Sequence, residues 1–424
     1  EAICGVGREQ VGAAAQMLWD ARPMAYYAWS GVEMQTNSTQ IARAIAQLSV
    51  LTGSFDVSGG NVLFSAAPSA NVMGFELLPA GQQAKALGFN DRPLGPSRWG
   101  YVTSDEVYRG ILRQQPYGVH GLVGFGANLL LAHADALRGR EALAKLDFYV
   151  HIDLFMNPTA EMADIVLPAA SAFEREALKI GFELNQESMS HVQLRQRMVP
   201  PQGECRSDTE IVFALACRLG LGAHFWDGDI EAAYRYQLGP SGISLETLRA
   251  QPGGVHIPLQ THHRKYADEE NGVARGFRTP TRKIELYSET MLNHGYPPLP
   301  EFEEPQMSPI SRPDLAERYP LILTSTKNAL FCETQHRALP SLRKQALDPE
   351  VELHPAAAAE RGIHPGDWVR VETPDGSVRA RARFNETLQP NVACGQHGWW
   401  QASPEIGAPG YDPFSPWWYS PYPY

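Results

Sequence analysis

The segment from residue 148 to 168 constrains the fold more than any other part of the chain. Residues 148–152 (FYVHI) form an apolar run that closes on Asp153, and residues 165–167 (IVL) form another that ends at Pro168. A loop of small, polar and acidic residues separates the two runs. Short apolar runs joined in this way are typical of neighbouring strands in a buried parallel sheet. We therefore predict an α/β fold in which a ligand lies beyond the carboxyl ends of these strands.

The length and charge of the chain limit its class. At 424 residues it exceeds what one hydrophobic core usually supports, so we expect two or three domains. Its 43% hydrophobic and 20% charged residues are typical of a folded globular protein. The net charge of −11 argues against a nucleic-acid partner or an anionic membrane surface. Because no apolar run approaches the roughly 20 residues of a membrane-spanning helix, we expect no direct membrane span.

The cysteines do not form a metal-binding pattern. None lies in a Cys-x-x-Cys pair or has the spacing of zinc or iron–sulfur ligands, and the odd, scattered set gives no disulfide framework. We interpret each as a buried thiol that acts as a small apolar residue, and we expect this chain to ligate no iron–sulfur cluster. They are Cys4, Cys205, Cys217, Cys332 and Cys394.

A polar loop between a predicted strand and a predicted helix lies near the beginning of the chain. The apolar residues 24–28 predict the strand, and apolar residues at helical spacing between positions 41 and 51 predict the helix. Asn37 or Ser38 can cap the start of this helix, and Gly53 can end it in a left-handed conformation. A loop in this position offers backbone N–H groups to an anion.

A second α/β unit begins near residue 119. One strand ends near Gly126 and Asn128, a helix is expected over residues 134–146, and the next strand ends at Asp153. Gly126, Asn128 and Asp153 are therefore expected at the same edge of the sheet. Glycine allows a ligand to approach the backbone closely, whereas a carboxylate can accept N–H bonds from a guanine edge or hold ribose hydroxyls.

Residues 173–315 are expected to add a pair of strands and several helices. We expect Asp208 to cap one helix, and two others to begin near Asp229 and Ser244. The histidine pair at positions 262 and 263 is interpreted as part of a solvated loop and not as a metal site.

The last part of the chain changes to alternating apolar and polar residues. Residues 351–353, 368–371 and 378–383 follow the period of strands, and Asp375-Gly376 between the last two predicts a hairpin turn. Short strands of this kind favour a closed β-barrel. Two polar loops, 324–337 and 396–401, bring hydroxyls, amides and one lysine to the strand ends, and these groups are suitable donors for an anion such as a pyrophosphate.

Two of these segments resemble one enzyme family. Residues 153–168 match the pattern D-x-F-x-x-x-T-A-x-x-A-D-x-V-L-P of the molybdopterin oxidoreductases, typified by dimethyl sulfoxide reductase. Residues 358–378 resemble the molybdopterin dinucleotide-binding domain of the same family. The resemblance implies Rossmann-like parallel-sheet domains followed by a closed C-terminal β-barrel of the double-psi type.

The family pattern also implies a division into domains. Residues 1–117 would be the remainder of a molybdopterin-binding α/β domain that is partly truncated at its N-terminus. Residues 118–315 would be a second α/β domain with its linker, and residues 316–424 the dinucleotide-binding β-barrel domain and tail. The chain is thus expected to be the C-terminal portion of a longer catalytic subunit.

The cofactor implied by the resemblance is a molybdenum or tungsten bis(molybdopterin guanine dinucleotide). Relatives ligate the metal, and a 4Fe-4S cluster, in a segment that precedes the family motifs found here, so we assign no metal ligand and no catalytic residue in this chain. The positions that match cofactor-contacting motifs are Trp29, Ser30, Gly31, Gln35, Asn37, Gly59, Gly60, Asn61, Asn71, Gly126, Asn128, Asp153, Ser325, Thr326, Lys327, Gln335, His336, Gln396, His397 and Trp399.

By the same resemblance, the expected activity is oxygen-atom transfer, or electron or hydride transfer, on a small substrate. Formate is disfavoured as the substrate, because residues 64–69 lack the arginine that formate dehydrogenases have in this stretch. An iron–sulfur electron-transfer subunit is an expected partner. Two alternatives stay open, namely a cofactor-free scaffold or electron-transfer subunit of the same fold, and a non-redox lyase related to acetylene hydratase. Whether the protein is located in the cytoplasm or in the periplasm also stays open.

Overall fold

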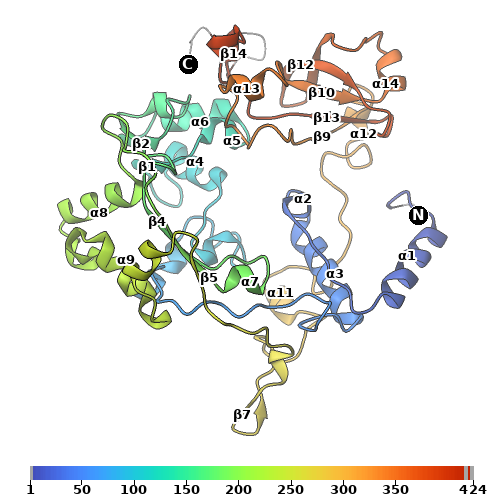
Figure 1. Cartoon of the computed structure of the whole chain (residues 1–424). Coiled ribbons are helices and arrows are strands. Elements are labelled where there is room, and N and C mark those ends of the chain that lie inside the picture. Colours follow the sequence, from blue (N-terminus) through green and yellow to red (C-terminus); the bar gives the residue numbers. More distant parts are fainter. Residues whose placement is uncertain (1–2, 415–418, 421–424) are drawn as a thin grey trace. The chain divides into compact units, whose positions relative to one another are not determined.

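The computed structural model (Figure 1) describes residues 3–414 and 419–420. The contacts within the chain divide it into two compact units. Unit 1 comprises residues 1–76, 176–198 and 213–305, and unit 2 comprises residues 77–175, 199–212 and 306–424. Neither unit is continuous in sequence, because the chain passes repeatedly from one to the other. The three sequential domains expected from the family pattern remain a prediction.

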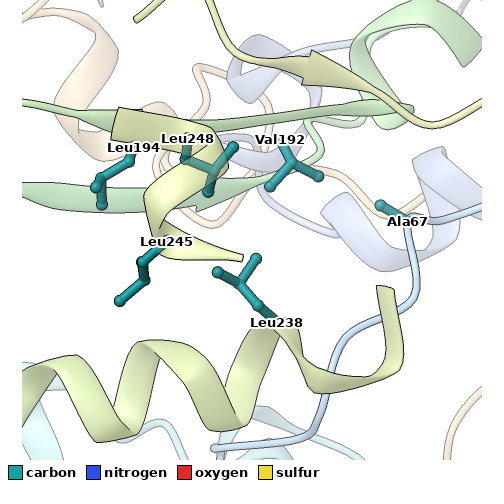
Figure 2. Packing of buried hydrophobic residues seen from close by; sticks show 6 residues of the cluster. All are labelled: Ala67, Val192, Leu194, Leu238, Leu245 and Leu248. Atoms are coloured by element: carbon teal, nitrogen blue, oxygen red, sulfur yellow. The ribbon is translucent and has the colours of Figure 1, made fainter. Parts of the chain in front are cut away.

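Unit 1 combines helices with a small antiparallel sheet in the order β4-β5-β6. Leucines of α9 and α10 pack against Val192 and Leu194 of β5, so the core lies between these helices and the sheet (Figure 2). Its elements are α1 (Arg8–Asp20), α2 (Ser30–Glu33), α3 (Ser38–Leu51), β4 (Ala177–Ile180), α7 (Gln186–Met189), β5 (His191–Arg195), α9 (Ile230–Leu238), α10 (Leu245–Ala250), β6 (Val255–His256), β7 (Glu269–Glu270), β8 (Val273–Ala274) and α11 (Glu289–Asn293).

The strand predicted over residues 24–28 is wrong. These residues have no regular secondary structure and pair with no strand in the described chain. The backbone of Tyr26 instead exchanges two hydrogen bonds with the side chain of Asn61. The neighbouring helix and its end are confirmed, since α3 begins after Asn37 and ends before Gly53, which has a φ of 66°. Its predicted cap is wrong, because Asn37 makes no side-chain capping bond and Ser38 lies inside the helix. Apolar residues alone do not make a strand where no neighbouring strand supplies ladder hydrogen bonds.

Unit 2 contains the predicted parallel sheet, with strands in the order β1-β2-β3. Ile152 of β2 packs with Ala169 and with Ile211 of α8, which places a helix against the sheet. Ser207, and not Asp208, is the cap of α8, because its side chain and Glu210 bond reciprocally across the first turn. The elements are α4 (Ser104–Arg113), β1 (Gly121–Phe125), α5 (Leu129–Ala132), α6 (Ala136–Leu143), β2 (Phe148–Asp153), β3 (Ile165–Pro168) and α8 (Asp208–Arg218), the last of which continues into unit 1.

The C-terminal part of unit 2 forms a five-stranded mixed sheet in the order β11-β12-β10-β13-β9. The hairpin predicted at Asp375-Gly376 is confirmed between β11 and β12. The closed barrel is not shown, because β9 and β11 are the two ends of this sheet in the described chain, and closure requires the end strands to pair with each other. The elements are α12 (Pro313–Ala316), β9 (Ile322–Ser325), α13 (Pro340–Arg343), β10 (Glu350–Leu353), α14 (Pro355–Ala359), β11 (Trp368–Thr373), β12 (Gly376–Phe384), β13 (Val392–Gly395), β14 (Gly410–Tyr411) and β15 (Tyr419–Ser420).

Short 3-10 helices occupy several connections: η1 (Phe75–Leu77), η2 (Gln83–Lys85), η3 (Pro96–Trp99), η4 (Ala160–Met162), η5 (Gly222–Gly228), η6 (Gly239–Ser241), η7 (Lys265–Ala267) and η8 (Pro404–Ile406). Among the described helices, none combines the length and the apolar character that a membrane crossing requires.

Candidate functional site

The carboxyl edge of the parallel sheet brings Gly126 and Asn128 next to the loop that follows β2. Gly126 has a φ of 57°, a conformation that favours glycine, and its N–H donates to Ile152 O at 2.8 Å. Asn128 is only 9% exposed, and its Oδ1 accepts from the hydroxyl of Thr159 at 3.0 Å. Its Nδ2 has no hydrogen-bond partner in the part of the chain that the structure describes. A buried donor in this state can bind a ligand acceptor without breaking an existing bond.

Asp153 organises the turn after β2. Its carboxylate accepts from the backbone N–H groups of Leu154 (2.6 Å) and Phe155 (3.3 Å), from Asn157 Nδ2 (2.8 Å) and from His151 Nε2 (3.2 Å). Burial opposes ionisation, but the hydrogen bonds, from His151 first, lower the pKa of Asp153 overall. The carboxylate is therefore charged at neutral pH and engaged by four donors, so its predicted direct contact with a ligand remains a prediction.

Two buried residues behind Asp153 were not singled out from the sequence. The hydroxyl of Tyr149 lies 2.6 Å from His151 Nδ1, and both side chains are almost fully buried. Burial raises the pKa of the Tyr149 hydroxyl. A Cβ at Gly124 would lie 3.1 Å from His151 Nδ1, so the ring packs closely on β1. The alternation of side chains along β2 places positions 149, 151 and 153 on one face, a signal that could have revealed this chain of hydrogen bonds.

A carboxylate joins the two polar loops of the C-terminal part. Glu333 Oε1 lies 2.9 Å from Lys327 Nζ, and Glu333 Oε2 lies 2.8 Å from His397 Nε2. The hydrogen bond from Lys327, followed by that from His397, lowers the pKa of Glu333. The sequence prediction named Lys327 and His397 but missed Glu333, which neutralises the lysine and so reduces its capacity to attract an anion.

Other predicted residues of these loops bond to the loops themselves or to the neighbouring strand β13. Thr326 N–H donates to Gly395 O at 2.9 Å, and Trp399 Nε1 donates to Gln396 Oε1 at 3.0 Å. Gln335 N–H donates to Cys332 O at 2.9 Å, and His336 has a φ of 73°. Backbone hydrogen bonds and the hydrogen bond from the Trp399 indole thus hold the loops in defined conformations.

A cavity of about 1330 Å³ lies within unit 2, between the C-terminal sheet and the segment from Leu130 to Leu137. Four of the predicted cofactor residues line it, namely Ser325, Gln396, His397 and Trp399. The seven others predicted in this unit do not: Gly126, Asn128, Asp153, Thr326, Lys327, Gln335 and His336. The charged groups in its wall are mostly acidic: Asp135, Glu350, Asp375 and Asp412 line it together with Arg379. This acidic wall could not be predicted from the sequence, because its residues come from distant segments.

The remaining predicted residues belong to unit 1. Trp29 is 69% exposed and stacks on Tyr27 with ring centroids 6.1 Å apart. Gln35 Nε2 donates to Gly31 O at 3.3 Å within the turn of α2, which also contains Ser30. Asn37 has a φ of 61°, and its Nδ2 donates to Glu301 O at 2.9 Å instead of capping α3. The loop around α2 is therefore exposed, and its ligand contacts remain a prediction.

The glycine turn after α3 has a structural role. A Cβ at Gly60 would lie 1.9 Å from Ser54 O, so only glycine fits there, and Gly59 has a φ of 82°. Asn61 uses both atoms of its amide to bind the backbone of Tyr26. Asn71 is exposed and bonds to Glu76. The structure assigns Asn61 to fold stabilisation and leaves the predicted cofactor contacts of this group untested.

Comparisons with known proteins agree with the resemblance found in the sequence. The family model "Molybdopterin oxidoreductase" matches residues 12–218, and "Molydopterin dinucleotide binding domain" matches residues 321–415. Acetylene hydratase of Syntrophotalea acetylenica is 28% identical over 442 aligned residues, which cover 96% of this chain and 58% of that protein. Dimethyl sulfoxide reductase DmsA of Escherichia coli (strain K12) is 27% identical over 433 residues, 94% of this chain and 51% of that protein.

The fold is also shared with a solved structure. Acetylene hydratase from Pelobacter acetylenicus superposes with a TM-score of 0.81 at 26% sequence identity, over 95% of this chain and 58% of that one. The chain therefore spans between about half and three fifths of the length of these relatives. The two family models together match most of the chain, and its relatives include dimethyl sulfoxide reductases. The chain belongs to the molybdopterin oxidoreductase family.

Proposed function

We propose that this chain encloses a molybdenum or tungsten bis(molybdopterin guanine dinucleotide) in the catalytic subunit of an enzyme that acts on a small molecule. The observation that carries the proposal is the cavity of unit 2, in a chain whose dinucleotide-binding domain is recognised by its family model. Pockets for drug-sized ligands have volumes of roughly 300–1,000 Å³, so about 1330 Å³ suits a ligand the size of a dinucleotide.

The residues present fit such a ligand chemically. Ser325 and Gln396 bring hydroxyl and amide groups to the cavity, His397 adds an imidazole, and Trp399 adds an aromatic wall. Hydrogen-bonding groups in an apolar frame hold pterin and guanine edges, and the buried Nδ2 of Asn128 is a further free donor at the sheet edge. When bound, the cofactor supplies a metal centre that exchanges electrons or an oxygen atom with the substrate, or activates it.

The chain itself orients the ligand and limits the access of water. The Glu333 carboxylate holds the Lys327 and His397 side chains in place, and charged Asp153 keeps the loop after β2 in one conformation. In the described residues, no group of three or more His, Cys, Asp or Glu side chains is arranged to hold a metal ion. By the resemblance to the family, and not from this absence, we propose that the ligand to the metal, a 4Fe-4S cluster and an electron-transfer partner are supplied from outside this chain.

Two reaction classes are candidates, and each has support from the comparisons. Oxygen-atom or electron transfer is favoured by the similarity to dimethyl sulfoxide reductases. Hydration is favoured by the similarity to acetylene hydratase, which extends over 95–96% of this chain in both sequence and fold. We place the redox reaction first, since the family model is that of oxidoreductases.

The test is to purify the protein that contains this chain from cells that make the cofactor. Molybdenum and tungsten are measured by mass spectrometry, and the oxidised pterin by its fluorescence. The protein is then assayed for reduction of dimethyl sulfoxide by a reduced viologen and for hydration of acetylene. Metal and pterin with viologen oxidation support the first candidate, and metal and pterin with hydration only support the second. Absence of both metal and pterin from folded protein would show a cofactor-free scaffold.

A further inference from the structure

Two arginines are buried behind the Trp399 wall of the cavity. Arg337 is 3% exposed and Arg343 is 0% exposed. Arg337 donates from Nη1 to Glu333 O (2.6 Å) and from Nη2 to His397 O (2.7 Å). It therefore ties together the two loops that carry the predicted cofactor residues. Its Nε is buried and has no hydrogen-bond partner among the described residues.

Arg343 makes a matching set of bonds to backbone carbonyls. It donates from Nε to Leu347 O, from Nη1 to Gln401 O and from Nη2 to Pro409 O, each at 2.8 Å. Carbonyl oxygens satisfy the hydrogen-bonding capacity of a guanidinium, but they are neutral and do not cancel its charge.

The charges of both arginines are close to the cavity. The guanidinium carbons of Arg337 and Arg343 lie 5.1 and 4.9 Å from the ring centroid of Trp399, which lines the cavity. Arg343 also lies 5.9 Å from the ring of Tyr411, another lining residue. Both cations therefore lie within 6 Å of aromatic rings that line the cavity.

Neither guanidinium has a carboxylate partner in the part of the chain that the structure describes. The carboxylates of Glu333 and Asp348 favour the charged forms of Arg337 and Arg343 through space, but both are engaged elsewhere. Glu333 binds Lys327 and His397, whereas Asp348 accepts from Tyr411 and pairs with Arg381 at 3.1 Å. Burial, and then the proximity of Arg343, lowers the pKa of Arg337 to about 10, so it is still charged at neutral pH. Buried charges without partners are costly and are rare in proteins unless a ligand compensates them.

We propose that Arg337 and Arg343 together supply the positive potential that binds an anionic group of the pyrophosphate class against the Trp399 wall. The inference rests on the proposed function, which brings a dinucleotide to this cavity. The wall itself carries Asp135, Glu350, Asp375 and Asp412 against Arg379, so that without the two buried cations the cavity would repel an anion. Because the cations are shielded from solvent, salt screens their field only weakly.

The experiment compares a charged and an uncharged probe that share one base. Binding of guanosine diphosphate and of guanosine to the full chain is measured by calorimetry, and the ratio of the two affinities is the readout. Arg337→Gln and Arg343→Gln remove the charge, whereas Arg337→Lys and Arg343→Lys keep it and alter the hydrogen bonds. Arg361→Gln is the control, since Arg361 also donates to a backbone carbonyl, Ala357 O, but lies outside the cavity wall.

We expect each Gln variant to weaken guanosine diphosphate binding by about tenfold and to leave guanosine binding unchanged. Two unit charges about 8 Å apart, at an effective dielectric constant near 20, attract each other strongly enough to change the dissociation constant by at least about tenfold. The Lys variants and Arg361→Gln should keep the ratio of the unaltered chain. Equal losses for both probes, or equal losses in Lys and Gln variants, would show that the arginines only fasten the loops and would overturn the inference.

A measurement on the unaltered chain covers the case in which a Gln variant does not fold. Inorganic pyrophosphate should displace guanosine diphosphate but should not displace guanosine. If guanosine diphosphate binds no better than guanosine and pyrophosphate displaces neither, the inference fails while the nucleoside site of the proposed function stands. If neither probe binds at all, the proposed function fails as well.

Discussion

At the scale of single residues, the site depends on polar groups whose partners come from distant parts of the sequence. Gly126, Asn128 and Asp153 could be placed at one sheet edge from the sequence, because the carboxyl ends of parallel strands coincide. The four donors around Asp153 and the carboxylate of Glu333 between Lys327 and His397 could not, because these contacts depend on how loops return in space. The kinds of residue at the site could be predicted from the sequence, but the hydrogen bonds and ion pairs between them could not.

Replacing Asp153 with Asn should destabilise unit 2 in a pH-dependent way. The folded pKa of Asp153 is lowered, so its carboxylate contributes stability above the unfolded pKa and loses it as the pH falls through the folded value. At pH 7 we expect Asp153→Asn to cost about 1–3 kcal/mol, because buried donors lose a charged acceptor. Urea unfolding at pH 7 and below pH 4 measures the difference, which should shrink at acid pH.

The control for this prediction is Asp147→Asn. The side chain of Asp147 is 76% exposed and pairs only with exposed His120 in the described contacts, so its removal should leave stability nearly unchanged. An Asp153→Asn penalty that stays constant across the same pH range would contradict the role given to the carboxylate.

Gly60 offers a sharper steric test. A methyl group there would lie 1.9 Å from Ser54 O, which also accepts the N–H of Asn61, so Gly60→Ala must displace the turn after α3. We expect a loss of roughly 2–4 kcal/mol in the free energy of unfolding. Gly53→Ala is the matched control: nothing lies within 4 Å of its Cβ, and only its φ of 66° opposes the change, at about 1 kcal/mol. Similar melting temperatures for the two variants would contradict this difference.

At the scale of helices and strands, the capped helices and the strands of the parallel sheet were predicted, whereas one predicted strand has no pairing partner in the described chain. The capped helices α9 and α10 begin after Asp229 and Ser244, as their capping residues indicated. The apolar residues 24–28, by contrast, remain unpaired, and α1 has no buried residue. A strand forms only where a neighbouring strand pairs with it, so an apolar pattern alone does not predict a strand reliably.

The capping box of α8 gives a test at this scale. Ser207→Ala should lower stability by about 1 kcal/mol, because the N–H of Glu210 loses its acceptor at 3.2 Å. Asp208→Ala should cost less, since Asp208 lies within the first turn and not at the cap. Chemical unfolding of both variants checks the order, and a larger loss for Asp208→Ala would contradict the observed cap.

At the scale of the whole chain, the division into units was beyond the reach of the sequence. Segments 176–198 and 213–305 fold with the first 76 residues, whereas the intervening segment 199–212 folds with unit 2. Local composition does not indicate which unit a segment joins, because the pattern of each segment predicts only a strand or a helix. The family predicted from the sequence is confirmed by the comparisons, and we infer that the cavity of unit 2 is where this chain holds the family's cofactor.

The most direct measurement is the nucleotide content of the protein purified from cells that make the cofactor. Acid hydrolysis of a guanine dinucleotide cofactor releases guanosine monophosphate, which is quantified by chromatography against the protein concentration. We predict release in stoichiometric amount, and a marked decrease for Trp399→Ala, which removes the aromatic wall of the cavity. Folded protein that contains no releasable guanosine monophosphate, or full release from the Trp399→Ala variant, would contradict the assignment of this cavity to the cofactor.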